Sequence, residues 1–229
     1  MKTFKNTIEF KYLFLLIIFA IATLASCKKK DDSSVNLSAY VMVTNAAEGS
    51  SPQDFYLDNV KLTTSAAAYA QSSGYLTTTA GNHAAQFTNS GTTTANASFS
   101  LAAQGGQYYS VYYTGGGTAS SNNYVTTQDD LTAPPSGKAK VRFINLSSAA
   151  AATVDFGTSA TNKLVTGLAY KAASAYYTVD AATSFALYAS GSSTATLNIP
   201  TTIQAGKIYT IYVSGSTTAT ITYHIVAQN

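Results

Sequence analysis

The sequence predicts an all-β protein with two tandem β-sandwiches that follow an export leader. Three observations point to this: an internal repeat, short stretches in which apolar and polar side chains alternate, and one apolar run near the N-terminus. The chain has 229 residues, which is enough for two small domains. Apolar residues make up 46% of the chain, which is sufficient to fill two cores, so wholesale disorder is not expected.

A basic stretch followed by an apolar run opens the chain. Lys2, Lys5 and Lys11 lie in the basic stretch, and residues 12–25 contain no charged side chain. This order is typical of a secretory signal peptide. The apolar run is shorter than the roughly 20 residues that a membrane-spanning helix needs. We therefore expect residues 1–26 to form a signal peptide that directs export without anchoring the chain.

The apolar run ends in a short motif that contains the only cysteine of the chain. Leu24, Ala25, Ser26 and Cys27 resemble the lipobox of bacterial lipoproteins, in which the thiol receives a diacylglyceryl group and a peptidase cuts before the cysteine. The resemblance implies that Cys27 is lipidated, and two or more acyl chains hold a protein stably on a membrane. A secretory leader with a chance cysteine near its end is the alternative. With one cysteine, no intramolecular disulfide can form.

Charged residues follow the cysteine directly. Three lysines at 28–30 precede Asp31 and Asp32, an order that resembles the signal carrying some lipoproteins of the Bacteroidota to the cell surface. We therefore expect a lipoprotein of the outer membrane that is exposed on the cell surface, with the periplasmic face as the alternative. Residues 27–37 are predicted to form the lipidated cysteine and a flexible tether, because charged, serine-flanked residues cannot pack into a core.

The rest of the chain repeats itself at an offset of about 100 residues. Four ordered blocks align: residues 39–45 with 139–145, 54–55 with 155–156, 69–77 with 170–178, and 106–115 with 206–215. Ordered blocks at a nearly constant shift indicate a duplicated unit.

A proline-containing segment separates the two copies. Residues 132–137 include Pro134 and Pro135, and proline lacks the N–H that a central strand requires. We therefore predict a first domain over residues 38–131, a linker over 132–137 and a second domain over 138–229.

Within each copy, the local patterns are those of β-strands. In the first copy, Tyr109, Val111 and Tyr113 share one face of a predicted strand, whereas Tyr108 and Tyr112 share the other. This period of two is expected where one face of a strand is buried. Thr, Val, Ile and Tyr also suit the pleated, half-buried surface of a sheet.

Short strands separated by turns indicate a sandwich architecture. Clusters of Gly, Asn and Ser interrupt the strand patterns at short intervals. We expect one further strand after the glycine turn of each copy, within residues 118–128 and 218–228. The alanine-rich segments 65–70 and 149–152 could form a helical turn on propensity alone, and loops are the alternative.

The order of the blocks is similar to that of the DUF4397 family, which comprises domains of unknown function in bacterial surface and secreted proteins. The resemblance rests on the sequences VRFIN at 141–145, VDF at 154–156 and AGKIYT at 205–210, and on their counterparts in the first copy. It implies two tandem immunoglobulin-like or prealbumin-like β-sandwiches and supplies no catalytic residues. The family's Ser-Pro-Asp-Ala-Pro stretch is replaced here by LSSAA at 146–150.

The distribution of charge argues against nucleic-acid binding. The formal net charge is +3, but six lysines lie in the first 30 residues. From Ser33 onward, seven basic residues balance seven acidic ones. A neutral folded part lacks the basic surface that phosphate groups require. We therefore do not expect a nucleic-acid partner. The expected partner is a membrane, contacted through the lipid anchor at Cys27.

Few residues could carry catalysis or hold a metal. His83 and His224 are the only histidines, and we interpret them as surface or strand-edge residues. The chain has no G-x-S-x-G elbow, no zinc-ligand spacing and no D-x-D-x-D-G calcium loop. We therefore expect a non-enzymatic protein without cofactor or bound metal; a hydrolase is a less favoured alternative. Asp54 and Asp155 recur in both copies, which predicts hydrogen bonds from each to a turn backbone.

Tyrosine is the remaining prominent feature, with 17 tyrosines and no tryptophan. An exposed row formed by Tyr108 and Tyr112 could stack on sugars or contact a surface protein, because the ring is apolar and the hydroxyl polar. Ordinary packing between strands is the simpler interpretation. The sequence thus predicts a lipid-anchored binding or structural module of the cell envelope. A glycan-binding accessory lipoprotein of a polysaccharide uptake system is the alternative.

Overall fold

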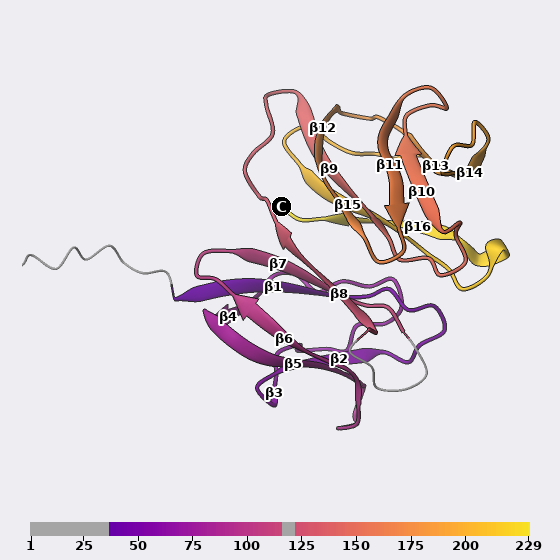
Figure 1. Ribbon diagram of the computed structural model, residues 1–229. Helices are drawn as coiled ribbons and strands as arrows, with labels where there is room; N and C mark the ends of the chain where they lie inside the picture. Colours follow the sequence, from indigo (N-terminus) through magenta and orange to yellow (C-terminus); the bar gives the residue numbers. More distant parts are fainter. Residues whose placement is uncertain (1–36, 116–121) are drawn as a thin grey trace, which may run out of the picture. The chain divides into compact units, whose positions relative to one another are not determined.

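The computed structural model describes residues 37–115 and 122–229 (Figure 1). The predicted signal peptide and Leu24, Ala25, Ser26 and Cys27 lie outside the described residues, as does nearly all of the predicted tether. The described part is all-β, as predicted, with sixteen strands and one 3-10 helix, and it contains no α-helix. No helix in this part is long and apolar enough to span a membrane.

The first half, residues 37–129, forms a β-sandwich of two four-stranded sheets. Its strands are β1 (Ser38–Asn45), β2 (Gln53–Leu57), β3 (Val60–Lys61), β4 (Leu76–Thr79), β5 (Gly81–Asn89), β6 (Ala95–Ala103), β7 (Tyr108–Tyr113) and β8 (Tyr124–Asp129). The strand orders are β4-β1-β7-β8 and β3-β2-β5-β6. The strands β1 and β7 pair in parallel, and the other pairs in this half are antiparallel.

The second half, residues 138–229, repeats this topology strand for strand. Its elements are β9 (Lys138–Asn145), β10 (Thr153–Gly157), β11 (Lys163–Ala169), β12 (Ala173–Asp180), β13 (Phe185–Ala189), β14 (Ala195–Ile199), β15 (Ile208–Ser214), the 3-10 helix η1 (Thr218–Thr220) and β16 (Thr222–Ala227). The strand orders are β12-β9-β15-β16 and β11-β10-β13-β14, and β9 pairs with β15 in parallel. The strands expected after the two glycine turns are present as β8 and β16. The alanine-rich segments form no helix, and Ala67 instead makes an isolated bridge to Gln53.

Each half has a hydrophobic core of its own between its two sheets. In the first half, the rings of Phe55 and Phe87 are fully buried with their centroids 4.9 Å apart. In the second half, Phe143 stacks on Phe156 at 4.7 Å. The two core clusters share no residue. Burying one such side chain contributes about 1.5–3 kcal/mol, so each sandwich has the basis for independent stability.

A third apolar cluster joins the two halves, which lie in one compact unit. It consists of Ala46, Tyr112 and Val125 of the first half and Ile144, Leu146 and Tyr212 of the second half. We call the face of a sheet that is turned away from its own core its outer face. The third cluster lies on the outer faces of the β4-β1-β7-β8 and β12-β9-β15-β16 sheets, because Tyr112 and Tyr212 alternate with the core residues of β7 and β15. These two outer faces therefore cover each other.

This contact overturns one expectation. Tyr109, Val111 and Tyr113 face the core, as the alternation predicted. The sequence left an exposed row of Tyr108 and Tyr112 as an alternative to ordinary packing, but the exposed fraction of Tyr112 is 0%. That alternative is wrong for Tyr112 because the second half covers the middle of the outer face; Tyr108, at the start of β7, stays half-buried.

Candidate functional site

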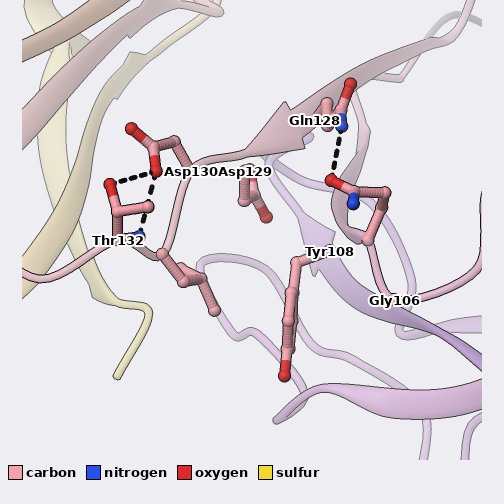
Figure 2. A pocket seen from close by; sticks show the side chains of 8 residues that line it. Gly106, Tyr108, Gln128, Asp129, Asp130 and Thr132 are labelled. Carbon is pink, nitrogen blue, oxygen red and sulfur yellow. Dashed lines mark hydrogen bonds between the residues drawn. The ribbon is translucent and has the colours of Figure 1, made fainter.

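A hollow of about 700 Å³ lies at the end of the first half where β8 leads out toward β9 (Figure 2). Its lining comes from the turn before β7, the start of β7, the end of β8 and the segment that follows. The lining residues are Gly106, Gln107, Tyr108, Gln128, Asp129, Asp130, Leu131 and Thr132.

The local fold brings the two sides of this hollow together. Gly106 has a φ of +78°, a conformation that suits glycine in the tight turn before β7. Antiparallel pairing then places Tyr108 directly opposite Asp129. Residues directly opposite each other in a sheet point to the same face, so the ring and the carboxylate lie on the outer face together.

Tyr108 belongs to a cluster of three tyrosines. Parallel pairing of β1 with β7 sets Tyr40 beside Tyr108, and their rings stack at 4.6 Å with an angle of 13°. Tyr75, just before β4, meets Tyr108 edge to face at 5.0 Å. The neighbouring rings hold Tyr108 in place while it remains half-buried at the hollow.

The Asp129 carboxylate is buried and fully engaged. Its side chain has an exposed fraction of 0%, and Oδ1 lies 2.7 Å from Nη2 of Arg142. Oδ2 accepts hydrogen bonds from Ser110 Oγ at 2.6 Å and from the hydroxyl of Tyr75 at 2.7 Å. Burial and the Asp129 charge raise the pKa of Tyr75, so this hydroxyl stays protonated and acts as the donor.

The Asp130 carboxylate is also paired. Nζ of Lys140 lies 2.6 Å from its Oδ2, and Thr132 donates to its Oδ1 through both its hydroxyl (2.6 Å) and its backbone N–H (3.0 Å). Figure 2 shows the two bonds from Thr132. The hydrogen bonds from Lys140 and Thr132 lower the pKa of Asp130 to about 2.

The hollow is therefore polar without an unpaired charge in its lining. Both carboxylates have a cationic partner, and the amide of Gln128 donates to that of Gln107 at 2.8 Å (Figure 2). Such a lining offers an aromatic ring, amide groups and a hydroxyl. These groups suit an uncharged ligand that has both C–H and hydroxyl groups.

The two histidines lie elsewhere and have different surroundings. His83 lies in β5, an interior strand of its sheet, and is only 8% exposed, so its interpretation as a surface or strand-edge residue is wrong. Its ring contacts Asp58 Oδ2 at 2.7 Å and the Thr79 carbonyl at 2.9 Å. His224 lies on β16, which is an edge strand, as expected.

His224 takes part in a small polar group between the halves. Its Nε2 lies 2.9 Å from Oγ of Ser214, and the hydroxyl of Tyr69 lies 2.8 Å from the same Oγ. Ser214 is fully buried, and the hydrogen-bond partners of His224 among the described residues, Ser214 and Tyr69, are hydroxyl groups and not carboxylates. This arrangement lacks the third group that orients the histidine of a catalytic triad.

The two repeated aspartates hold turns, as predicted. Asp155 accepts hydrogen bonds from the backbone N–H groups of Gly167 (2.8 Å) and Gly191 (3.2 Å). Asp54 accepts one from Gly91 N–H at 3.3 Å and forms an ion pair with Lys61 at 2.7 Å. No group of three or more His, Cys, Asp or Glu side chains that could hold a metal ion is found within residues 37–115 and 122–229.

Sequence reasoning identified Tyr108 but missed most of its surroundings. Tyr40 and Tyr75 reach Tyr108 through strand pairing and a loop, which residue spacing does not reveal. The one usable signal was the repeat, because it aligns the stretches that contain Tyr40 and Tyr108 with two strands of the second copy. The lipidation residues lie outside the described part.

Comparisons with known proteins found a matching family and similar solved structures. A sequence model of the family described as "Domain of unknown function (DUF4397)" matches residues 39–157, from β1 to the end of β10. The comparison with curated proteins found no match. The chain is similar to the structure titled "Crystal structure of CBMbc (family CBM26) from Eubacterium rectale Amy13K in Complex with Maltoheptaose", with 11% sequence identity and a TM-score of 0.25, over 81% of this chain and 96% of that chain.

Proposed function

The chain belongs to the DUF4397 family, and we propose that it is a lipid-anchored protein of the cell envelope that acts as a non-enzymatic binding or structural module. The hollow beside Tyr108 favours binding over a purely structural role. It combines a half-buried aromatic ring, two side-chain amides and two carboxylates that are already paired with cations. This is the single observation that carries the proposal.

The state of the two carboxylates supports a non-enzymatic role. A carboxyl group that acts as a general acid needs a raised pKa, and glycoside hydrolysis needs two carboxyl groups that face each other across the substrate. The pKa of Asp130 is instead lowered to about 2 by Lys140 and Thr132. Asp129 is buried against Arg142, with no exposed side-chain surface.

The lipid anchor at Cys27 determines where the module acts. The lipobox resemblance and the charged residues after it support an outer-membrane lipoprotein on the cell surface, with the periplasmic face as the other arrangement.

Cys27→Ala should abolish incorporation of labelled palmitate and shift the protein from the membrane fraction to the soluble one. Ser26→Ala, which keeps a small residue before the cysteine, is the matched control and should be labelled normally. Unchanged partitioning of Cys27→Ala would contradict the anchor. Protease treatment of intact cells then distinguishes the surface from the periplasmic face.

A glycan is the ligand class that the hollow favours, which gives a second candidate function as an accessory of a polysaccharide uptake system. The C–H face of a sugar stacks on a tyrosine ring, and sugar hydroxyls pair with amides and with an exposed ionised carboxylate such as that of Asp130. An anionic ligand would find no unpaired cation in the lining, and a cationic ligand would compete with Lys140 and Arg142.

A glycan array tests both the ligand class and the site. We expect binding by the wild-type chain and a loss of at least tenfold for Tyr108→Ala. The matched control is Tyr170→Ala, which removes an exposed tyrosine of the second half that lies outside the hollow. No binding across the array would reject glycans as ligands. Retained binding by Tyr108→Ala would reject the hollow as the site.

A further inference from the structure

The two halves contact each other through equivalent residues. Tyr112 and Tyr212 occupy the same position in β7 and β15, and their rings meet at 5.7 Å with an angle of 65°. Ala46 and Leu146 are likewise equivalent and belong to the same cluster. Contact between equivalent residues marks an isologous interface, the kind that a two-fold symmetric dimer forms. The interface inside this chain therefore has approximate two-fold symmetry.

Hydrogen bonds at the interface follow the same symmetry. Tyr75 and Tyr176 are equivalent, and each donates its hydroxyl to a side-chain oxygen at 2.7 Å, Tyr75 to Asp129 and Tyr176 to Gln228. Gln228 also donates to the Tyr75 hydroxyl across the interface at 3.4 Å.

Strand register confirms that Asp129 and Gln228 occupy equivalent positions. Asp129 lies opposite Tyr108 in the pairing of β7 with β8. Gln228 donates its backbone N–H to the carbonyl of Ile208, and Ile208 is the counterpart of Tyr108.

Ion pairs between the two halves break the symmetry, and in the pair of Arg142 with Asp129 both side chains are buried. Arg142 of β9 meets Asp129 of the first half at 2.7 Å, and their side chains are 3% and 0% exposed. Arg142 also donates to Thr210 Oγ1 at 2.9 Å, and its guanidinium lies over the ring of Tyr176. The residue equivalent to Arg142 is Met42, and the residue equivalent to Asp129 is Gln228. The symmetry-related position therefore holds no charge.

We propose that the outer face of the β4-β1-β7-β8 sheet is a pairing surface for a second domain of the same fold, and that Asp129 and Arg142 determine which domain it accepts. Two first halves paired in this way would bury Asp129 opposite Met42. Two second halves would bury Arg142 opposite Gln228. A buried charge without a partner is strongly destabilising. Only a first half with a second half pairs the charges, so the surface selects the other half of the chain.

Separate halves provide the direct test, because each half has its own two sheets and its own closed core. Residues 37–131 and 138–229 are produced separately and their masses measured by light scattering, alone and mixed. We expect each wild-type half to be monomeric at concentrations at which the mixture forms a 1:1 complex. A first half that self-associates as tightly as it binds the second half would overturn the proposal.

Asp129→Gln in the first half tests the selecting residue itself. We expect binding to the second half to weaken at least tenfold, because Arg142 is then buried without its carboxylate partner. We expect self-association of the first half to strengthen at least tenfold, because the variant no longer buries an unpaired carboxylate. Asp58→Asn, which removes a carboxylate outside the interface, is the matched control and should change neither affinity. If Asp129→Gln also changes neither, Asp129 does not select the partner.

The full chain provides a second measurement that does not require the halves to fold alone. Urea unfolding is followed for Asp129→Gln, Arg142→Met and the double variant. The double variant replaces the ion pair by Gln and Met, the neutral residues that stand at the symmetry-related position. We expect each single substitution to lower the unfolding midpoint and the double variant to recover most of the loss. Additive losses in the double variant would overturn the proposal.

Discussion

The hydroxyl of Tyr209 accepts a hydrogen bond from the backbone N–H of Gln204, 3.1 Å away. Tyr109 accepts the same bond from Gln104 at 3.0 Å in the first half. In both halves the bond ties the segment before the parallel strand to that strand. The repeat has thus preserved a tertiary contact together with its sequence.

Removing the Tyr209 hydroxyl should destabilise the protein. Tyr209→Phe leaves the Gln204 N–H without this acceptor, which typically costs about 1 kcal/mol of unfolding free energy. Tyr212→Phe is the matched control on the same strand, because the Tyr212 hydroxyl is buried and has no hydrogen-bond partner among the described residues. Urea unfolding should show a loss for Tyr209→Phe and none for Tyr212→Phe. An equal loss in both would contradict the role of the hydrogen bond.

His83 should stabilise the fold more at low pH than at high pH. Both of its ring nitrogens face acceptors, Asp58 Oδ2 at 2.7 Å and the Thr79 carbonyl at 2.9 Å, so the protonated ring satisfies both. Burial lowers the pKa of His83, but the hydrogen bonds to Asp58 and Thr79 outweigh it, and the pKa is raised above 6.5. The stabilisation is therefore complete below pH 6.5 and is lost as pH rises through the folded-state pKa.

Urea unfolding of the wild type and of His83→Gln between pH 5 and pH 9 measures this effect. The stability difference between the two should shrink as the pH rises. A difference that stays constant across this range would show that His83 does not bind its proton more tightly in the folded state.

His224 should have the opposite pH dependence. Burial lowers its pKa from 6.5 to about 4, between the rings of Tyr69 and Tyr212. Because the unfolded chain binds the proton more tightly, stability should fall as the pH drops from 6.5 to about 4. His224→Phe keeps a ring against Tyr212 and should remove this part of the acid sensitivity. An NMR titration of the wild-type imidazole with a midpoint near 6.5 would contradict the prediction.

Gly157→Ala should destabilise the second sandwich through a steric clash. A Cβ at this position would clash with the carbonyl oxygen of Asn162 and lie 2.9 Å from Cα of Lys163, so the backbone would have to shift. Overpacking of this kind costs about 1–3 kcal/mol. Gly74→Ala is the control, because no atom lies within 4 Å of its added Cβ. Thermal unfolding should show a lower midpoint for Gly157→Ala only; equal midpoints for the two variants would contradict the clash.

Local alternation predicted which side of β7 faces the core but not what covers the other side. Tyr109 and Tyr113 are buried, at 7% and 5% exposure, as the period of two requires. Tyr112 is buried because β9 and β15, far along the chain, lie over it. The alternation of side chains along a strand predicts which residues share a face of the sheet. It does not predict that a second sandwich packs on that face.

The candidate site was predictable only in part for a related reason. Tyr108 was found because the alternation places it on the strand face opposite Tyr109 and because a tyrosine combines an apolar ring with a polar hydroxyl. Tyr40 and Tyr75 reach it through the parallel β1–β7 pair and the loop before β4. The pairing of Asp130 with Lys140 and of Asp129 with Arg142 likewise depends on the path of the chain between the halves. Composition predicted a neutral surface but not which charges neutralise each other.

The position of β1 has a mechanical consequence. It is the first strand after the N-terminal segment, and it is bonded on both sides, to β4 over Ser38–Val41 and to β7 over Tyr40–Asn45. A pull from the N-terminal side acts along the length of this strand. It therefore loads the hydrogen bonds on both sides together, in shear, instead of peeling them one at a time from an edge. If Cys27 is the attachment point, drag on the protein is transmitted first to a strand that must slide past two neighbours before the sandwich can open.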